Sequence, residues 1–328
     1  MGGIGSRTGV PIVTSLAIIV VSYNTRDRTL ECLRSVLREP AGVPTEVIVV
    51  DNDSRDGSAD AIEREVPTVT VIRSDRNLGF ARGVNLGADH ASAEYLLLLN
   101  PDTVVLPGSL AALLNFALAH PRHGIYGGRT LHEDGTLDPS SCWGAPTLWS
   151  LTCFALGLST AFPRSGLFNP ESLGRWQRNS VRTVPIVTGC LLLVGRDRFL
   201  DLGGLDPRYF LYGEDAEFSL RARGRGLRPV IVPEAQIIHA VGASTGARGP
   251  KMSMIMAGKV TMLRSLWPAT RARVGVALMV VGVALRAGLE SATRRRDRMW
   301  VHVWRTRAAW LPGYPAAERT LFGLETVP

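Results

Sequence analysis

The sequence predicts an α/β fold in which a mainly parallel, open sheet is flanked by helices. Continuous apolar, β-branched runs of strand length alternate with segments whose apolar residues recur at helical spacing. Runs that are apolar throughout, rather than at every second position, are typical of strands buried on both faces of a parallel sheet. Strand–helix alternation of this kind joins parallel strands through crossover helices.

The elements of this sheet can be placed in order along the chain. The expected strands in the first hundred residues are Leu16–Ser22, Glu46–Val50, Thr68–Arg73 and Glu94–Leu99. Asn24 or Thr25 can cap a first helix, a second runs through Ala59–Glu65, and Asn77–Ala91 reads as a glycine-rich loop that enters a third.

The second part of the domain has a less regular pattern. Residues 120–185 are rich in Gly, Pro, Trp and Ser and show no clear periodicity, so we expect binding loops there. Val187–Val194 predicts a further buried strand. Arg228–Val232 and Ala235–His239 predict extended segments on either side of Pro233.

We expect three parts in the chain: a flexible leader of residues 1–14, a domain of residues 15–260, and a basic amphipathic helical tail of residues 261–328 that its charge sets apart. Residues 260–328 hold 11 arginines and 4 acidic residues, so they carry +7 of the net charge of +8. The nearly neutral body argues against a nucleic-acid groove. The four cysteines are scattered, which favours reduced thiols in the cytoplasm over a disulfide framework or a zinc cluster.

The tail contains a short apolar run between arginines. Val274–Leu285 has 12 residues, whereas a bilayer-spanning helix needs about 20. Arginines and tryptophans follow it, a combination that suits a helix lying in the headgroup region of a membrane. The alternative is a buried helix pair that packs on the domain.

Polar residues follow three of the predicted strands. Ligands of open parallel sheets bind beyond the carboxyl ends of the strands, which lie at one edge. The residues at these ends are Ser22, Tyr23 and Asn24; Asp51, Asn52 and Asp53; and Asn100, Pro101 and Asp102. Turn formation alone would explain any one of these groups, but the three together favour a site.

These residue types fit a nucleotide diphosphate sugar. Asp51 can accept a hydrogen bond from a pyrimidine N–H, and Tyr23 can stack on the ring. Asp102 can hold a divalent cation against the diphosphate. In the glycine-rich loop that begins at Asn77, Gly79 permits close backbone approach, and the flanking Arg76 and Arg82 can neutralise phosphate charge.

A second polar cluster lies near residue 214. Glu214 and Asp215 precede a helical segment, so the helix dipole stabilises their carboxylates by about 0.3–1 kcal/mol. Simple capping is the alternative explanation. His239 ends an apolar segment and is followed by Ser244, which makes it a candidate contact to a metal or a phosphate.

Six blocks together resemble family 2 glycosyltransferases, and most closely their rhamnosyltransferase branch. The blocks are Ile18–Asn24, Asp51–Ser58, Asn77–Asn85, Asn100–Asp102, Gly204–Arg221 and His239–Gly246. The resemblance implies a GT-A fold and inversion at the anomeric carbon. It assigns Asp51 to the base of the donor, Asp215 to catalysis as the general base, and His239 to the metal.

The resemblance also implies that Asp102 is the last acid of a D-x-D metal motif for Mg²⁺ or Mn²⁺. Asn100 departs from that motif because it replaces the first acid, which weakens metal binding by charge. Glu214 is the second candidate for the base.

The resulting hypothesis is a glycosyltransferase of cell-envelope glycan synthesis, at the inner face of the plasma membrane. Its best donor is dTDP-rhamnose, and its acceptor is a polyprenyl-linked sugar or a growing polysaccharide, bound by the loops of residues 120–185. A sugar nucleotidyltransferase would need a lysine-bearing phosphate loop after the first strand, where none stands. A non-catalytic sugar-nucleotide-binding protein would not need Asp215. A dehydrogenase would need G-x-G-x-x-G there.

Overall fold

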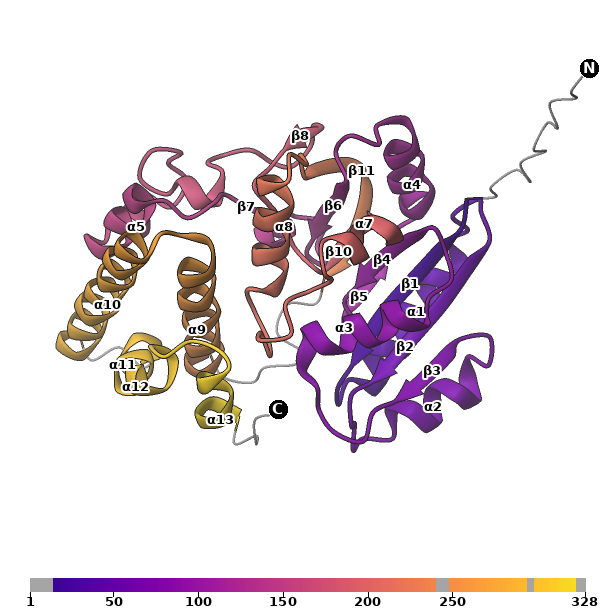
Figure 1. Cartoon of the computed structure of the whole chain (residues 1–328), viewed down its shortest axis with the longest axis horizontal. Coiled ribbons are helices and arrows are strands. Elements are labelled where there is room, and N and C mark those ends of the chain that lie inside the picture. The colour runs from indigo at the N-terminus through magenta and orange to yellow at the C-terminus, as the bar shows by residue number, and fades with distance from the viewer. Residues whose placement is uncertain (1–13, 240–247, 294–297, 323–328) are drawn as a thin grey trace, which may run out of the picture.

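A computed structural model of the chain describes residues 14–239, 248–293 and 298–322. The sheet and its helices occupy one side of the molecule, and the C-terminal helices occupy the other (Figure 1). The expected leader, except for residue 14, lies outside the described residues, as do Ser244 and the arginines at 294–296.

A mixed sheet forms the centre of the domain, with the strand order β3-β2-β1-β4-β10-β6-β11-β5, and β8 pairs with β11. Its strands are β1 (Leu16–Ser22), β2 (Thr45–Asp51), β3 (Thr70–Arg73), β4 (Tyr95–Leu99), β5 (Thr103–Val105), β6 (Ile125–Leu131), β8 (Arg182–Thr183), β10 (Leu191–Gly195) and β11 (Val230–His239). The short strands β7 (Cys142–Trp143) and β9 (Ile186–Val187) pair with each other.

The first four strands are parallel, as the sequence predicts. β10 is antiparallel to both of its neighbours, β4 and β6. β11 is parallel to β6, while β5 and β8 are antiparallel to β11. The two extended segments expected around Pro233 form the single strand β11, which has a register shift between Ile231 and Gln236.

The helices that precede the tail divide into two groups. They are α1 (Arg26–Arg38), α2 (Ser58–Glu65), α3 (Gly79–His90), α4 (Ser109–Ala119), α5 (Leu148–Ala155), α6 (Leu158–Ala161), α7 (Arg196–Asp201) and α8 (Glu214–Gly224). Helices α1–α4, α7 and α8 flank the sheet, whereas α5 lies against α10 (Ala269–Ala292) and α6 packs on α5 (Figure 1). The cap of α1 differs from the prediction: Thr25 stands at the N-cap without a capping side-chain bond, and the Arg26 N–H donates to Asp56 Oδ2 at 2.9 Å.

Alternate residues of β1 enter two different hydrophobic cores. Ile19 packs in the core that includes α3 and α8, and Ile18 packs in the core that includes α1, α2 and α4. This division explains why the strand is apolar from Leu16 to Val21. α3 approaches β1 closely because it has glycine there: a Cβ at Gly87 would lie 2.6 Å from Ile19 Cγ2.

The segment of residues 120–185 is more regular than its composition predicts. It supplies β6, a central strand, as well as α5 and α6. Gly127 and Gly128 lie in the middle of β6, where a Cβ would meet Val187 Cγ1 at 2.5 Å and Ala235 O at 2.3 Å respectively. Close packing therefore requires the two glycines that weaken the strand pattern in the sequence.

The tail is helical, as expected, and is built from α9 (Arg248–Leu266), α10 (Ala269–Ala292), α11 (Met299–Arg305), α12 (Arg307–Trp310) and α13 (Ala316–Phe322). α9 crosses the boundary placed at residue 260. α10 corrects the estimate of length from the apolar run alone. It has 24 residues and a mean hydropathy of 1.7 over its best window, which is long and apolar enough to cross a membrane, and 39% of that window is buried.

Candidate active site

The ends of β1 and β2 bring the first polar groups together. Ser22 and Asp51 are paired in the parallel register, and the Asn52 N–H donates to Ser22 O at 2.8 Å. The Ser22 hydroxyl, predicted to contact the donor, has hydrogen-bond partners in the turn and in α1. It is fully buried and bonds to the Thr25 and Thr29 hydroxyls, so it stabilises the turn.

Asp51 has the environment of a ligand-binding carboxylate. Its side chain is buried, and its Oδ2 accepts from the Ser54 N–H at 3.2 Å. Its Oδ1 is buried and has no hydrogen-bond partner among the described residues. A buried polar atom without a partner costs about 1–3 kcal/mol, so a ligand N–H at this position would offset that cost.

The other residues of these two turns divide into exposed and structural groups. Tyr23 is 45% exposed, so its ring has a free face. Asn24 and Asp53 both adopt the left-handed backbone conformation, with φ of 52° and 65°. The Asn24 side chain accepts from the Arg55 N–H at 2.7 Å, which ties the first turn to the second.

The glycine-rich loop is held by Asn52, which the sequence places directly after β2 without indicating its role. Asn52 is buried, and its Nδ2 donates to Asn77 Oδ1 at 2.8 Å and to Gly79 O at 3.2 Å. Gly79 has φ of +77°, and a Cβ there would lie 2.4 Å from Phe210 O. The position of Asn52 between Asp51 and Asp53 was the available signal.

Arg82, predicted to neutralise phosphate charge, forms an ion pair with the tail. Its Nη1 pairs with Glu318 Oε1 of α13 at 3.1 Å, and the Glu318 side chain is almost completely buried. Two further contacts hold the tail against the loop before α8: the Phe210 and Phe322 rings lie 4.3 Å apart, and the Tyr314 hydroxyl donates to Leu211 O at 2.6 Å. Arg82 thus joins α3 to the tail.

Asp102 and His239 meet although they are far apart in the sequence. His239 Nε2 lies 3.4 Å from Asp102 Oδ1, and its Nδ1 lies 3.1 Å from Asp138 Oδ2. Burial lowers the pKa of His239, but the hydrogen bonds and charges of Asp102 and Asp138 outweigh it and raise that pKa to about 9. Asn100 is partly exposed, and its N–H donates to Cys190 O at 3.3 Å.

Asp138 is a residue of the site that the sequence did not reveal, because residues 120–185 show no motif. Its carboxylate is buried and accepts from the N–H and the hydroxyl of Ser140 at 2.9 and 2.5 Å. Burial raises the pKa of Asp138, but the hydrogen bonds from His239 and Ser140 outweigh that effect, so the pKa lies below its ordinary value. Asp138 therefore fixes the orientation of the imidazole ring.

Glu214 and Asp215 begin α8, as the sequence predicts. Asp215 Oδ2 accepts from the Gly189 N–H at 3.0 Å, and its Oδ1 accepts from the Ala216 N–H at 2.7 Å. Glu214 is more deeply buried, and its Oε2 has no partner among the described residues. Burial, together with the neighbouring charge of Asp215, raises the pKa of Glu214, and burial also raises the pKa of Asp215.

Backbone contacts link these groups along one edge of the sheet. Gly189, which bonds to Asp215, is followed by Cys190, whose carbonyl accepts from Asn100, two residues before Asp102. A Cβ at Gly189 would lie 3.1 Å from the Phe80 ring, which follows the Gly79 loop. The ends of β2 and β4 and the start of α8 therefore border a common region.

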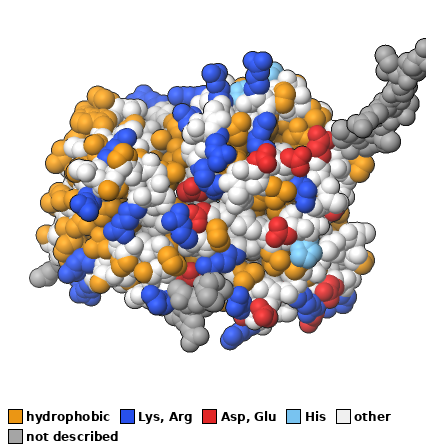
Figure 2. All heavy atoms as spheres, in the orientation of Figure 1, with side chains coloured by type: hydrophobic (Ala, Val, Ile, Leu, Met, Phe, Trp, Pro, Cys, Tyr) orange, Lys and Arg blue, Asp and Glu red, His pale blue; other side chains and the backbone are white. Residues whose placement is uncertain are grey.

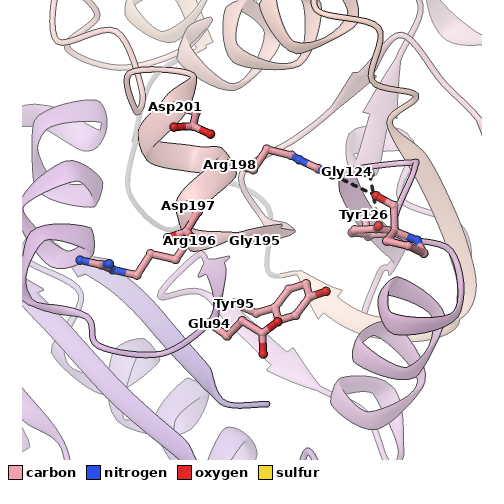
Figure 3. A pocket seen from close by; sticks show the side chains of 10 residues that line it. Glu94, Tyr95, Gly124, Tyr126, Gly195, Arg196, Asp197, Arg198 and Asp201 are labelled. Carbon is pink, nitrogen blue, oxygen red and sulfur yellow. Dashed lines mark hydrogen bonds between the residues drawn. The ribbon is translucent and has the colours of Figure 1, made fainter. Parts of the chain in front are cut away.

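A separate cavity of about 260 Å³ lies at the other edge of the sheet, where β4 begins and β10 ends. Figure 3 shows the side chains that line it, among them Tyr95, Arg196 and Arg198. None of the candidate site residues lines this cavity.

Comparison with known proteins gives the family. The sequence profile described as glycosyl transferase family 2 matches residues 17–168. N-acetylglucosaminyl-diphospho-decaprenol L-rhamnosyltransferase of Mycobacterium tuberculosis is 32% identical over 245 residues, which cover 70% of this chain and 78% of that protein. O-antigen biosynthesis protein RfbC of Myxococcus xanthus is 29% identical and covers 70% of this chain, which matches 18% of that protein.

Solved structures share the fold. The mannosyltransferase PcManGT from Pyrobaculum calidifontis, in complex with GDP-Man and Mn²⁺, covers 94% of this chain and 88% of its own with a TM-score of 0.57 and 17% identity. GalNAc-T7 with UDP, GalNAc and Mn²⁺ covers 77% and 48% with a TM-score of 0.54 and 18% identity. The sheet and its helices are a GT-A fold, and the chain belongs to the family 2 glycosyltransferases.

Proposed function

We propose that this glycosyltransferase transfers L-rhamnose from dTDP-rhamnose to a polyprenyl-diphosphate-linked sugar in cell-envelope glycan synthesis. The sugar and the acceptor follow the rhamnosyltransferase of M. tuberculosis, whose name specifies both. The observation that carries the proposal is the buried, unpaired Oδ1 of Asp51 on the edge that also holds Asp102 and Asp215.

The base of the donor would bind at the ends of β1 and β2. Thymine offers one ring N–H, and Asp51 Oδ1 is the acceptor without a partner there. Tyr23 is exposed beside it and can stack on the ring. The loop Asn77–Gly79, held by Asn52, would approach the diphosphate through its backbone.

A divalent cation, Mg²⁺ or Mn²⁺, fits the pair Asp102 and His239. No group of three or more His, Cys, Asp or Glu that could hold a metal occurs among the described residues. Two protein ligands suffice when phosphate oxygens and water complete the shell, as is usual for such ions. When bound, the cation would neutralise the charge that develops on the departing diphosphate.

The chemistry we propose is a single displacement with inversion. Asp215 accepts the proton of the acceptor hydroxyl while that oxygen forms its bond to the anomeric carbon. The bond from that carbon to the diphosphate oxygen breaks, and the nucleoside diphosphate leaves. The Gly189 and Ala216 N–H groups hold the Asp215 carboxylate in one orientation, and burial raises its pKa, which makes it a stronger base.

The acceptor and the membrane would lie on the side of the tail. We propose that the loops of residues 120–185 bind the acceptor, and that the protein is peripheral on the inner face of the plasma membrane. Nucleotide sugars are made in the cytoplasm, and a polyprenyl-linked acceptor presents its headgroup at the membrane surface. The basic tail and α10 support this location.

A panel of nucleotide sugars tests the proposal directly. We expect dTDP-rhamnose with Mn²⁺ to raise the melting temperature more than UDP, GDP or other dTDP sugars do, and to label a short-chain polyprenyl-diphosphate N-acetylglucosamine. Equal stabilisation by a non-thymidine donor, with transfer of its sugar, would show that dTDP-rhamnose is not the specific donor. Transfer only to a soluble polysaccharide would contradict the proposed polyprenyl-linked acceptor.

Asp138→Ala should weaken Mn²⁺ binding by about 10- to 100-fold, because residues that orient a metal-binding histidine have effects of this size. Asp138→Asn should restore much of the affinity, since its side-chain oxygen can still accept from His239 Nδ1. Titration of Mn²⁺ in the presence of saturating dTDP, followed by electron paramagnetic resonance, measures this without activity. Asp134→Ala, at an exposed position of the same connection, is the control, and an equal loss in both alanine variants contradicts the assignment.

A further inference from the structure

α10 presents an apolar stripe to the solvent as well as to the protein. Val274, Val281, Leu285 and Leu289 recur at helical spacing and are 46%, 46%, 49% and 65% exposed. The opposite stripe of the helix, which includes Met279 and Val283, is buried. A helix that packs on a soluble domain normally carries polar residues on its outer face, so this outer stripe has no explanation in the folding of the domain.

The one charge within this stretch of the helix is used internally. Arg286 is buried, and its Nη1 donates to Phe154 O at 2.6 Å, while its Nη2 reaches Thr160 Oγ1 at 2.9 Å. Its guanidinium also lies 4.0 Å from the centre of the Phe154 ring. From residue 274 to residue 289, α10 therefore exposes no charged side chain.

The segment that Arg286 holds in place is itself apolar on the outside. α5 packs along α10, and a Cβ at Gly282 would lie 2.5 Å from the Phe154 ring. The large apolar side chains exposed in this segment are Leu148, Trp149, Leu156, Phe162 and Leu167. Figure 2 shows hydrophobic side chains gathered over the end of the molecule where Figure 1 places α5 and α10.

Positive charge surrounds this apolar end. Arg271 and Arg273 are exposed at the start of α10, and Arg305 and Arg307 are exposed in and after α11. Arg271 and Arg307 lie over the rings of Trp267 and Trp304, at 4.1 and 4.4 Å. Residues 260–328 carry +7 of the net charge. An apolar surface bordered by arginines and tryptophans complements anionic lipid headgroups above acyl chains.

We infer that the outer faces of α5, α6, residues 162–167 and α10 form one surface that inserts into an anionic bilayer at the headgroup boundary. The tail supplies one part of this insertion surface and the segment of residues 148–167 supplies the other. The inference rests on the proposed function in one respect: the lipid-linked acceptor would lie in the same membrane. The membrane contact itself depends on the apolar and basic surface alone.

Flotation of the full chain with vesicles tests the insertion surface. The double variants Leu285→Glu/Leu289→Glu in the tail and Leu156→Glu/Leu167→Glu in the other segment each should reduce partitioning into phosphatidylglycerol–phosphatidylcholine vesicles at least tenfold. Vesicles of phosphatidylcholine alone should bind the unmodified protein more weakly. Leu37→Glu on α1, where Leu37 is 50% exposed, is the matched control and should bind as the unmodified protein does.

Four results would overturn the inference. Unchanged flotation of both double variants would show that this surface does not bind the membrane. A loss of flotation in the tail variant alone would show that residues 148–167 are not part of the insertion surface. Oligomers in vesicle-free solution that both variants dissociate would assign the surface to a second copy of the chain. Brominated-lipid quenching that decreases in Trp149→Phe supports insertion of residues 148–167 without adding a charge, and quenching that stays unchanged in that variant contradicts it.

Failure of this inference can be told apart from failure of the proposed function. Stabilisation by donor and Mn²⁺ in lipid-free solution reports on the nucleotide site only. A double variant that keeps this stabilisation but no longer floats supports the surface. Normal flotation of a protein that shows no response to any nucleotide sugar contradicts the donor site and leaves the insertion surface standing.

Discussion

Asp215→Asn should reduce the rate of sugar transfer by about 10²- to 10⁴-fold, the range typical of a lost general base, while donor affinity stays within about twofold. The amide keeps the size of the side chain, and its oxygen can still accept one of the two backbone hydrogen bonds from Gly189 and Ala216. It cannot accept the proton of an acceptor hydroxyl. Initial rates with saturating donor, together with the donor-induced shift in melting temperature, separate the two effects.

Glu214→Gln is the matched control for that variant. Glu214 is buried beside Asp215, and its raised pKa shows that the protein favours its neutral form. A neutral amide of the same shape should therefore retain most of the transfer rate. If Glu214→Gln lost the activity and Asp215→Asn kept it, Glu214 would be the base instead.

Asp102→Asn should lower the rate of transfer by about 10²- to 10³-fold and weaken binding of Mn²⁺ in the presence of donor. A divalent ion that stabilises a departing diphosphate contributes several kcal/mol, and each 1.36 kcal/mol corresponds to about tenfold in rate. Asn100 already places one neutral side chain in the motif. Asp102 is therefore the single acid of Asn100–Asp102. Without it, His239 would be the only protein ligand that we assign to the ion.

Metal titration distinguishes this role from a structural one. Activity removed by EDTA should return with Mn²⁺ in the unmodified protein at far lower concentration than in Asp102→Asn. Asp53→Asn, on the same edge but in the left-handed turn after β2, should keep the unmodified metal requirement. Full activity of Asp102→Asn in EDTA would show that the reaction does not need the ion.

Much of the parallel half of the fold could be predicted because local pattern and burial agree there. β1, β2 and β4 each contain at least four consecutive buried apolar residues, and their ends carry the polar residues that parallel pairing must place at one edge. The start of α8 at Glu214 also follows from local sequence. These features depend on neighbours within a few residues, which a sequence shows directly.

The features that escaped prediction depend on contacts between distant residues. β6 is a central strand although it contains two glycines. Those glycines are required because Val187 and β11 pack closely against them, which the local sequence does not show. Asp138 reaches His239 across 101 positions, and Arg82 reaches Glu318 across 236. Whether a surface arginine serves a ligand or a distant carboxylate is decided by the tertiary fold, and the sequence around Arg82 carries no trace of it.

The contacts of α13 have a consequence for communication within the molecule. The helix touches α3 through Glu318 and the loop before Asp215 through Phe322, while the helices that precede it in the tail carry the apolar stripe and exposed arginines. If donor binding restricts that loop, dissociation of α13 from the domain costs more free energy. By reciprocity, an event that loosens the contacts of α13 lowers the affinity for the donor. Amide hydrogens of residues 316–322 should therefore exchange more slowly once a nucleotide sugar is present, even though none of them touches it.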